Sequence, residues 1–231
     1  MSENNLNNQA AASAATSQVE SNTSCAACGC NAPDLPWSGR GTDLPIVGCR
    51  FSLYPMSDNF IDLILGSLEK TDTSCVWSES DALSTVYRGR LEYVADAVKA
   101  LFINAYRDGV HMAIEGQFSK GCPGDVSGDS KLDEVGEAPN KAVVAEKHFP
   151  VKCKFALYPM GCGDYISHIA DVWRMAEDRG LQPTTIHYAT RLTGDVHDIF
   201  DYLKDVCEKM DTAVSHYIIH FTMNCNSPTE E

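Results

Sequence analysis

Three side chains that can take part in polar chemistry occur twice in this 231-residue chain, with nearly constant spacing. A phenol can stack on a flat ring, and a hydroxyl or a neutral imidazole can both donate and accept hydrogen bonds. Such groups suit a flat heteroaromatic ligand that carries an amino group, although they could equally satisfy the backbone of the fold. The pairs are Tyr54 and Tyr158, Thr85 and Thr190, and His111 and His216.

Motifs typical of catalysis do not accompany these pairs. The sequence has no P-loop, no GxSxG elbow, no GxGxxG after a strand and no HExxH. The run from Asp195 to Asp198 has the side chains for acid–base chemistry, but it follows Gly194, where acidic residues favour a helix N-terminus. We therefore interpret this run as a helix cap, and predict no catalytic residues and no enzymatic activity.

Two further segments resemble metal-binding motifs. Cys25, Cys28 and Cys30 have the CxxC spacing with which thiolates hold zinc, but no second CxxC or HxxxH follows, so we favour redox-exposed thiols. The stretch 125–133 resembles a calcium loop. Such a loop needs Gly at its sixth position and a bidentate carboxylate at its twelfth, where Ser130 and Gly136 stand. We predict no metal and no cofactor.

The duplicated side chains belong to a repeated unit. The hexapeptides 51–56 and 155–160 differ at one position, Ser52 against Ala156, and the apolar positions that follow them correspond as well. Each copy reads strand, helix, strand, strand, helix, strand. This order predicts an α+β protein of tandem ferredoxin-like (βαββαβ) repeats, with antiparallel sheets and helices on one face.

The first repeat is predicted in some detail. Apolar residues at i, i+3 and i+4 indicate the two helices, and alternation of apolar and polar residues indicates the last strand. Ser57 or Asp58 is expected to cap the first helix. The predicted elements are a strand over 46–56, a helix over 59–70, strands over 75–79 and 82–88, a helix over 91–107 and a strand over 110–120.

The chain divides into four segments by composition. We expect a disordered extension over 1–44, repeats over 45–120 and 151–231, and a linker over 121–150. The fold does not require this linker to be ordered. Helices cover one side of each sheet, so the sister repeat, a second subunit or a ligand must cover the other side. We expect the repeats to pack together and the chain to form a homodimer.

Composition excludes several classes of function. A formal charge of −14 argues against nucleic acid and against a membrane surface. No apolar run approaches the ~20 residues that span a bilayer, and the N-terminus has no signal-peptide pattern, so we expect a cytoplasmic protein without membrane insertion. In a reducing compartment, the scattered cysteines act as free, small hydrophobic residues.

Several strings together resemble a known family. In the first half these are 51–56, 71–74, 76–77, 84–86, 88–89 and 121–125; in the second half they are 155–160, 187–189, 194–195 and 226–228. Over about residues 46–228 the sequence resembles the YkoF family of thiamin- and hydroxymethylpyrimidine-binding proteins. The resemblance implies a dimer that binds thiamin or its hydroxymethylpyrimidine (HMP) precursor, one ligand per repeat, in pyrimidine salvage or uptake, with a precursor transporter as a possible partner.

Duplication and strand placement, joined to this resemblance, select the candidate ligand contacts. The divergence of Ser52 from Ala156 and of Arg88 from Thr193 predicts unequal affinities at the two sites. Two rival functions remain open: an enzyme of thiamin-precursor metabolism, and a regulatory module that senses another small ligand. The candidate ligand-binding residues are Ser52, Tyr54, Thr85, His111, Tyr158, His187, Thr190 and His216.

Overall fold

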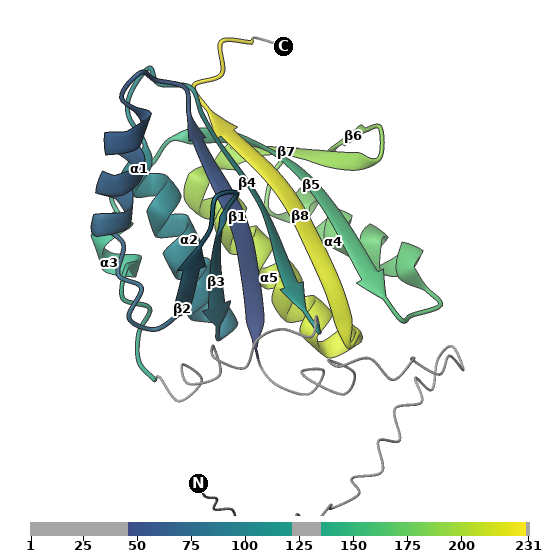
Figure 1. Ribbon diagram of the computed structural model, residues 1–231. Coiled ribbons are helices and arrows are strands. Elements are labelled where there is room, and N and C mark those ends of the chain that lie inside the picture. The colour runs from purple at the N-terminus through teal and green to yellow at the C-terminus, as the bar shows by residue number, and fades with distance from the viewer. Residues whose placement is uncertain (1–45, 122–134, 230–231) are drawn as a thin grey trace, which may run out of the picture.

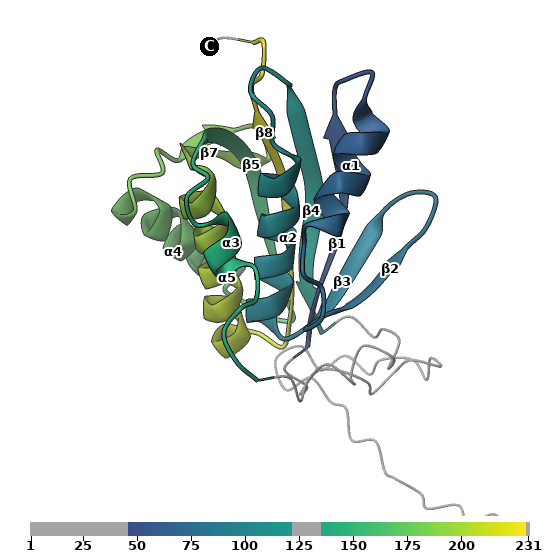
Figure 2. The ribbon, with the colours of Figure 1, turned by 90° about the vertical axis from the view of Figure 1, so that its left-hand side faces the viewer.

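The computed structural model describes residues 46–121 and 135–229. The N-terminal extension, the cysteine motif at 25–30 and the calcium-like stretch at 125–133 lie outside these residues. Eight antiparallel strands form one sheet, and Figure 1 looks onto that sheet with the helices behind it. Figure 2, turned by 90°, shows α2, α4 and α5 to one side of the strands.

Both repeats have the predicted order of elements. The first repeat comprises β1 (Val47–Pro55), α1 (Phe60–Glu69), β2 (Trp77–Ser80), β3 (Thr85–Gly89), α2 (Leu91–Ala105) and β4 (Met112–Lys120). The second follows the short helix α3 (Lys141–Val144) and comprises β5 (Pro150–Met160), α4 (Tyr165–Asp178), β6 (Thr184–Ile186), β7 (Ala189–Asp195), α5 (Val196–Ala213) and β8 (His216–Cys225). Each has the strand order of a ferredoxin-like unit, so the predicted fold class is confirmed.

The two repeats join edge to edge through their last strands. The sheet order is β2-β3-β1-β4-β8-β5-β7-β6, with β4 and β8 antiparallel. Gly116 of β4 faces Phe221 of β8, and a Cβ at this glycine would lie 2.7 Å from the phenylalanine Cζ. The absence of a side chain at Gly116 therefore lets Phe221 cross the junction and stack against Phe118, with ring centroids 5.6 Å apart. One continuous core results.

This arrangement leaves one face of the sheet without a covering layer from the sister repeat. We expected the sister repeat to be one of the elements that could cover that face, but the repeats lie side by side because β4 and β8 hydrogen-bond as neighbours. The face carries polar side chains at the junction, where His220 Nε2 lies 3.1 Å from Glu115 Oε1. Among the described residues, no helix is long and apolar enough to cross a membrane.

Several boundaries differ from the predicted ones. Helix α1 begins at Phe60 with Asn59 as its N-cap and no side-chain cap, so the expected capping by Ser57 or Asp58 is wrong. The Ser57 hydroxyl instead accepts from the Asn59 N–H at 3.2 Å. Strand β4 begins at Met112, which places His111 just before the strand; Met112, Ile114 and Phe118 are buried on one face, as alternation predicted.

The second half of the linker packs on the first repeat, contrary to the expectation that the fold would not need it to be ordered. Asn140 is buried, and both its backbone N–H and its side-chain amide donate to Asp96 Oδ2, at 3.0 and 2.8 Å. The same side chain exchanges two hydrogen bonds with the backbone of Asp72. Phe149 then stacks on Tyr106 with ring centroids 3.8 Å apart. This segment therefore fastens α2 to the loop after α1.

Candidate functional site

Strand β1 has an open edge in its second half. Its pairing with β3 ends at Phe51 opposite Thr85, whereas its pairing with β4 continues to Pro55. The Met56 N–H donates to His111 O, on the β4 side. Because the amides of a strand alternate in direction, the N–H and C=O of Leu53 point to the opposite, open side. One backbone donor and one acceptor thus stand side by side without a strand partner among the residues that the structure describes.

A cavity of about 200 Å³ lies at this edge. Apolar side chains of the sheet and of helices α1 and α2 form one wall, and the loop between β2 and β3 forms another. Thr85 lies opposite the buried Phe51 and so shares its face of the sheet, while Ser52 and Tyr54 alternate to the other face. The lining residues are Phe51–Tyr54, Ile64, Leu68, Asp81–Thr85 and Leu101.

Polar contacts fasten the loop over the cavity. Arg50 Nη1 donates to Asp81 Oδ2 at 3.0 Å and to Ser84 Oγ at 2.6 Å. The Ser52 hydroxyl donates to Leu83 O at 3.0 Å. Asp81 Oδ1 also accepts from the N–H groups of Leu83 and Ser84; these bonds, followed by Arg50, lower the pKa of the Asp81 carboxyl. The loop is therefore tied to strand β1 by a charged side chain and a hydroxyl.

The structure brings together three of the four residues predicted for the first site. Ser52, Tyr54 and Thr85 line the cavity, and the Thr85 hydroxyl also lies 2.8 Å from the hydroxyl of Ser80. His111 does not line it, because it lies in the turn before β4 and contributes its carbonyl to Met56. Its Nε2 is buried and has no hydrogen-bond partner among the described residues.

The residues predicted for the second site occupy equivalent places. Thr190 lies opposite Phe155, as Thr85 lies opposite Phe51, and Tyr158 is 53% exposed, close to the 48% of Tyr54. His187 lies in the turn between β6 and β7 and is exposed. His216 begins β8 opposite Met160; burial lowers its pKa, and its Nε2 is buried without a partner in the part of the chain that the structure describes.

Comparison with known proteins places these repeats in a family. The model of the YKOF-related family matches residues 46–125 and 150–230. The chain belongs to this family. It is also similar to the "Putative HMP/thiamine-binding protein YkoF" of Bacillus subtilis (strain 168), with 40% identity over 186 residues, which cover 80% of this chain and 93% of the relative. The resemblance found in the sequence is confirmed.

The sequence did not single out Arg50, Asp81 or the backbone of Leu53. Arg50 alternates with Ser52 and Tyr54 on one strand face, and this spacing was a usable signal. Asp81 between two predicted strands is also typical of a turn in which the carboxylate caps nearby amides. The open edge at Leu53 had no sequence signal, because it depends on where β3 stops pairing with β1.

A larger groove lies on the helix side of this YKOF-related protein, between α2 and α5. It has a volume of about 800 Å³ and is lined by side chains of both charges. Lys99 Nζ lies 2.7 Å from Asp201 Oδ1 across it, and Arg179 pairs with Asp205. None of the predicted ligand residues lines this groove, and Lys99 and Asp201 already form an ion pair across it. We therefore place the candidate site at the smaller cavity.

The run that follows Gly194 caps a helix, as predicted. Asp195 is the N-cap of α5, and its Oδ1 accepts from the N–H of His197 at 2.9 Å.

Proposed function

We propose that this YKOF-related protein binds HMP, or the pyrimidine ring of thiamin, without transforming it. Each repeat would hold one ligand at the open edge of its first strand. The observation that carries the proposal is the cavity beside Leu53, which three independently predicted residues line. The relative that is 40% identical to this chain and named for HMP and thiamine binding supports the choice of ligand.

The edge of β1 has the hydrogen-bonding pattern that an aminopyrimidine needs. The exocyclic amine would donate to the C=O of Leu53 while the adjacent ring nitrogen accepts from its N–H, as a neighbouring strand would. Ile64, Leu68 and Leu101 supply an apolar wall for one face of the ring, and Tyr54 stands at the opening for stacking. A ligand without the amine would leave the carbonyl unsatisfied and lose affinity.

The size of the cavity favours recognition of the pyrimidine alone. Pockets that enclose drug-sized ligands occupy roughly 300–1,000 Å³, whereas this cavity has about 200 Å³. One substituted six-membered ring suits such a volume, and the thiazolium of thiamin would extend into solvent. The formal charge of −14 favours that cation over anionic phosphate esters.

The second repeat supports a similar but less enclosed site. Leu157, Tyr158 and Thr190 correspond to Leu53, Tyr54 and Thr85, but the residues that fasten the loop differ. Lys154, Ala156, Ile186 and Ala189 replace Arg50, Ser52, Asp81 and Ser84. We propose that this site binds the same ring more weakly, with His187 of the β6–β7 turn as an additional contact and the half-buried imidazoles of His111 and His216 as supporting groups.

The proposal includes a cellular role. The protein would act in the cytoplasm as a homodimer that serves pyrimidine salvage or uptake and passes its ligand to or from a precursor transporter. The sheet face that the sister repeat leaves uncovered supports dimer formation, because a second subunit could cover it.

Calorimetric titration of the full chain would test the proposed ligand. We expect HMP and thiamin to bind with similar affinity and to be recovered unchanged. HMP lacking its 4-amino group should bind at least about tenfold more weakly, since a site built for an amine is left unpaired. If neither HMP nor thiamin binds at high micromolar concentration, the proposal is wrong; if the ligand is recovered altered, the protein is an enzyme.

A further inference from the structure

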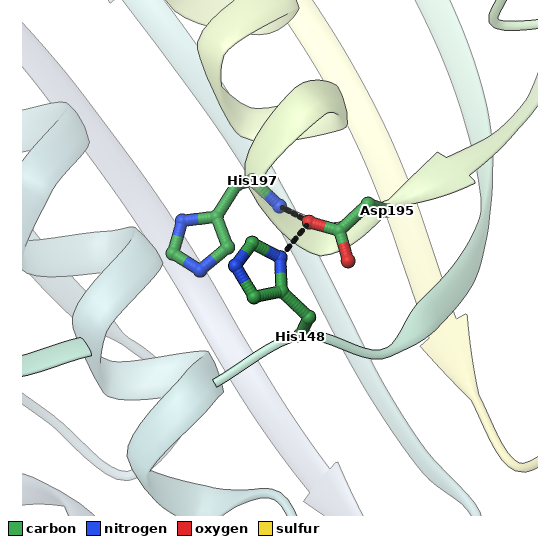
Figure 3. Close-up of side chains that lie close together, drawn as sticks. All are labelled: His148, Asp195 and His197. Carbon is green, nitrogen blue, oxygen red and sulfur yellow. Dashed lines mark hydrogen bonds and ion pairs between the residues drawn. The ribbon is translucent and has the colours of Figure 1, made fainter. Parts of the chain in front are cut away.

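Three side chains with metal-ligating atoms converge at the start of α5, away from the candidate cavity. His148, Asp195 and His197 each offer a ligand atom, and the three atoms lie within 4.8 Å of one another. Figure 3 shows the two imidazole rings side by side, with the ring of His148 between the ring of His197 and the carboxylate of Asp195. The ring centroids are 4.7 Å apart. The proposed ligand site uses none of these residues.

Strand pairing and hydrogen bonds fix the arrangement. Pro150 pairs with Asp195 in the β5–β7 ladder, which brings the segment before β5 to the β7–α5 corner. Asp195 Oδ1 accepts from the N–H of His197 and lies 3.1 Å from His148 Nδ1. His197 Nε2 lies 3.1 Å from the carbonyl oxygen of Lys147. A carbonyl partner such as that of His197 commonly orients an imidazole in metal sites, by bonding the ring nitrogen that does not bind the metal.

We propose that His148, Asp195 and His197 form a binding site for a divalent transition-metal ion of the zinc class. Two imidazoles and one carboxylate select such ions over calcium and magnesium, which prefer oxygen ligands alone. Three protein ligands leave one tetrahedral position for water. The carboxylate supplies the negative charge that a cation needs beside the positive end of a helix.

Closing the site needs only a small movement. Metal–ligand distances of about 2.0–2.2 Å bring tetrahedral ligand atoms to roughly 3.5 Å from one another, so the present 4.8 Å spread must contract by about an ångström. The His148 side chain is 62% exposed and can turn toward its neighbours at little cost. The Asp195 cap bond can persist meanwhile, because the second carboxylate oxygen has no hydrogen-bond partner among the described residues.

The site belongs to the second repeat alone. Positions 90 and 92, which correspond to 195 and 197, hold Arg90 and Glu92. An occupied site would tie residue 148 to the start of α5. It would thus join the segment before β5 to a helix that lines the junction between the repeats.

Cobalt titration of the untagged full chain, followed by absorption, would test this site. Cys25, Cys28, Cys30 and Cys122 are replaced by Ser, so that the thiols outside the described residues do not compete. We expect one Co²⁺ per chain with visible d–d bands and no thiolate charge-transfer band. Zn²⁺ should displace the cobalt and raise the Tm, because a metal that binds the folded state stabilises it.

Single substitutions then locate the ion. His148→Ala, His197→Ala and Asp195→Asn should each weaken Co²⁺ binding by at least about tenfold, while His168→Ala on α4 should leave it unchanged. Asp195→Asn keeps an oxygen that can accept the helix-cap bond, so a lost metal is not confused with a lost helix; circular dichroism checks the fold of every variant. No saturable binding, or binding that survives all three substitutions, would overturn the proposal.

Discussion

The first and second repeats differ in the contacts of the loop between their second and third strands. In the first repeat, Arg50 reaches Asp81 and Ser84, and the Ser52 hydroxyl reaches Leu83 O, so the β2–β3 loop is fastened beside the cavity. In the second repeat the corresponding turn contains His187 and Tyr188, and the Tyr188 side chain is fully exposed. Duplication therefore kept the strand edge, whereas the closure of the cavity diverged.

A second difference concerns a duplicated aspartate. Asp96 is buried in the first repeat and accepts two hydrogen bonds from Asn140 of the linker. Its equivalent, Asp201, is exposed and pairs with Lys99 across the junction between α2 and α5. The same residue type thus anchors the linker in one repeat and joins the repeats in the other. Correspondence in sequence shows the place of a side chain and leaves its role open.

Replacement of these aspartates gives the largest expected contrast. Asp96→Ala should lower the free energy of unfolding by about 3 kcal/mol, because the buried N–H and amide of Asn140 lose their charged acceptor. Asp201→Ala, the matched control, should cost only about 1 kcal/mol, because the Asp201 carboxylate is exposed to solvent even though Lys99 is largely buried. Urea denaturation measures both, and equal losses would contradict the contrast.

A smaller contrast is expected at the loop. Arg50→Ala removes the side chain that bonds Asp81 and Ser84, so HMP should bind about tenfold more weakly at the first site, which corresponds to about 1.4 kcal/mol. Lys154→Ala, its counterpart in the second repeat, should leave the first site unaffected. Calorimetry on both variants checks this; an Arg50→Ala protein with unchanged affinity would show that loop closure plays no part in binding.

The sequence predicted most of the fold because its signals are local and occur twice. The alternation of Met112, Ile114 and Phe118 located β4, and the repeated hexapeptide aligned β1 with β5. The edge-to-edge junction was not predicted, because it depends on long-range pairing and on the missing side chain at Gly116. The docking of Asn140 on the first repeat was not predicted either, because Asn140 is a polar residue in a Gly- and charge-rich segment.

The candidate cavity was predictable only in part, for related reasons. Ser52, Tyr54 and Thr85 could be chosen because their strands were visible in the sequence, and Tyr54 and Thr85 are also duplicated. The predicted strand over 110–120 included His111, but β4 begins at Met112, and His111 does not line the cavity. The donor and acceptor of Leu53 are backbone groups, which carry no residue-specific signal.

Calorimetric titration with HMP of the wild type, Ile64→Trp and Ile169→Trp tests the central claim most directly. Ile64 lines the cavity from α1, and Ile169 is its equivalent on α4, so each indole should block one strand edge while circular dichroism confirms the fold. We predict two sites per chain in the wild type and one in each variant. Two unaltered sites in both variants would contradict binding at the open edges of β1 and β5.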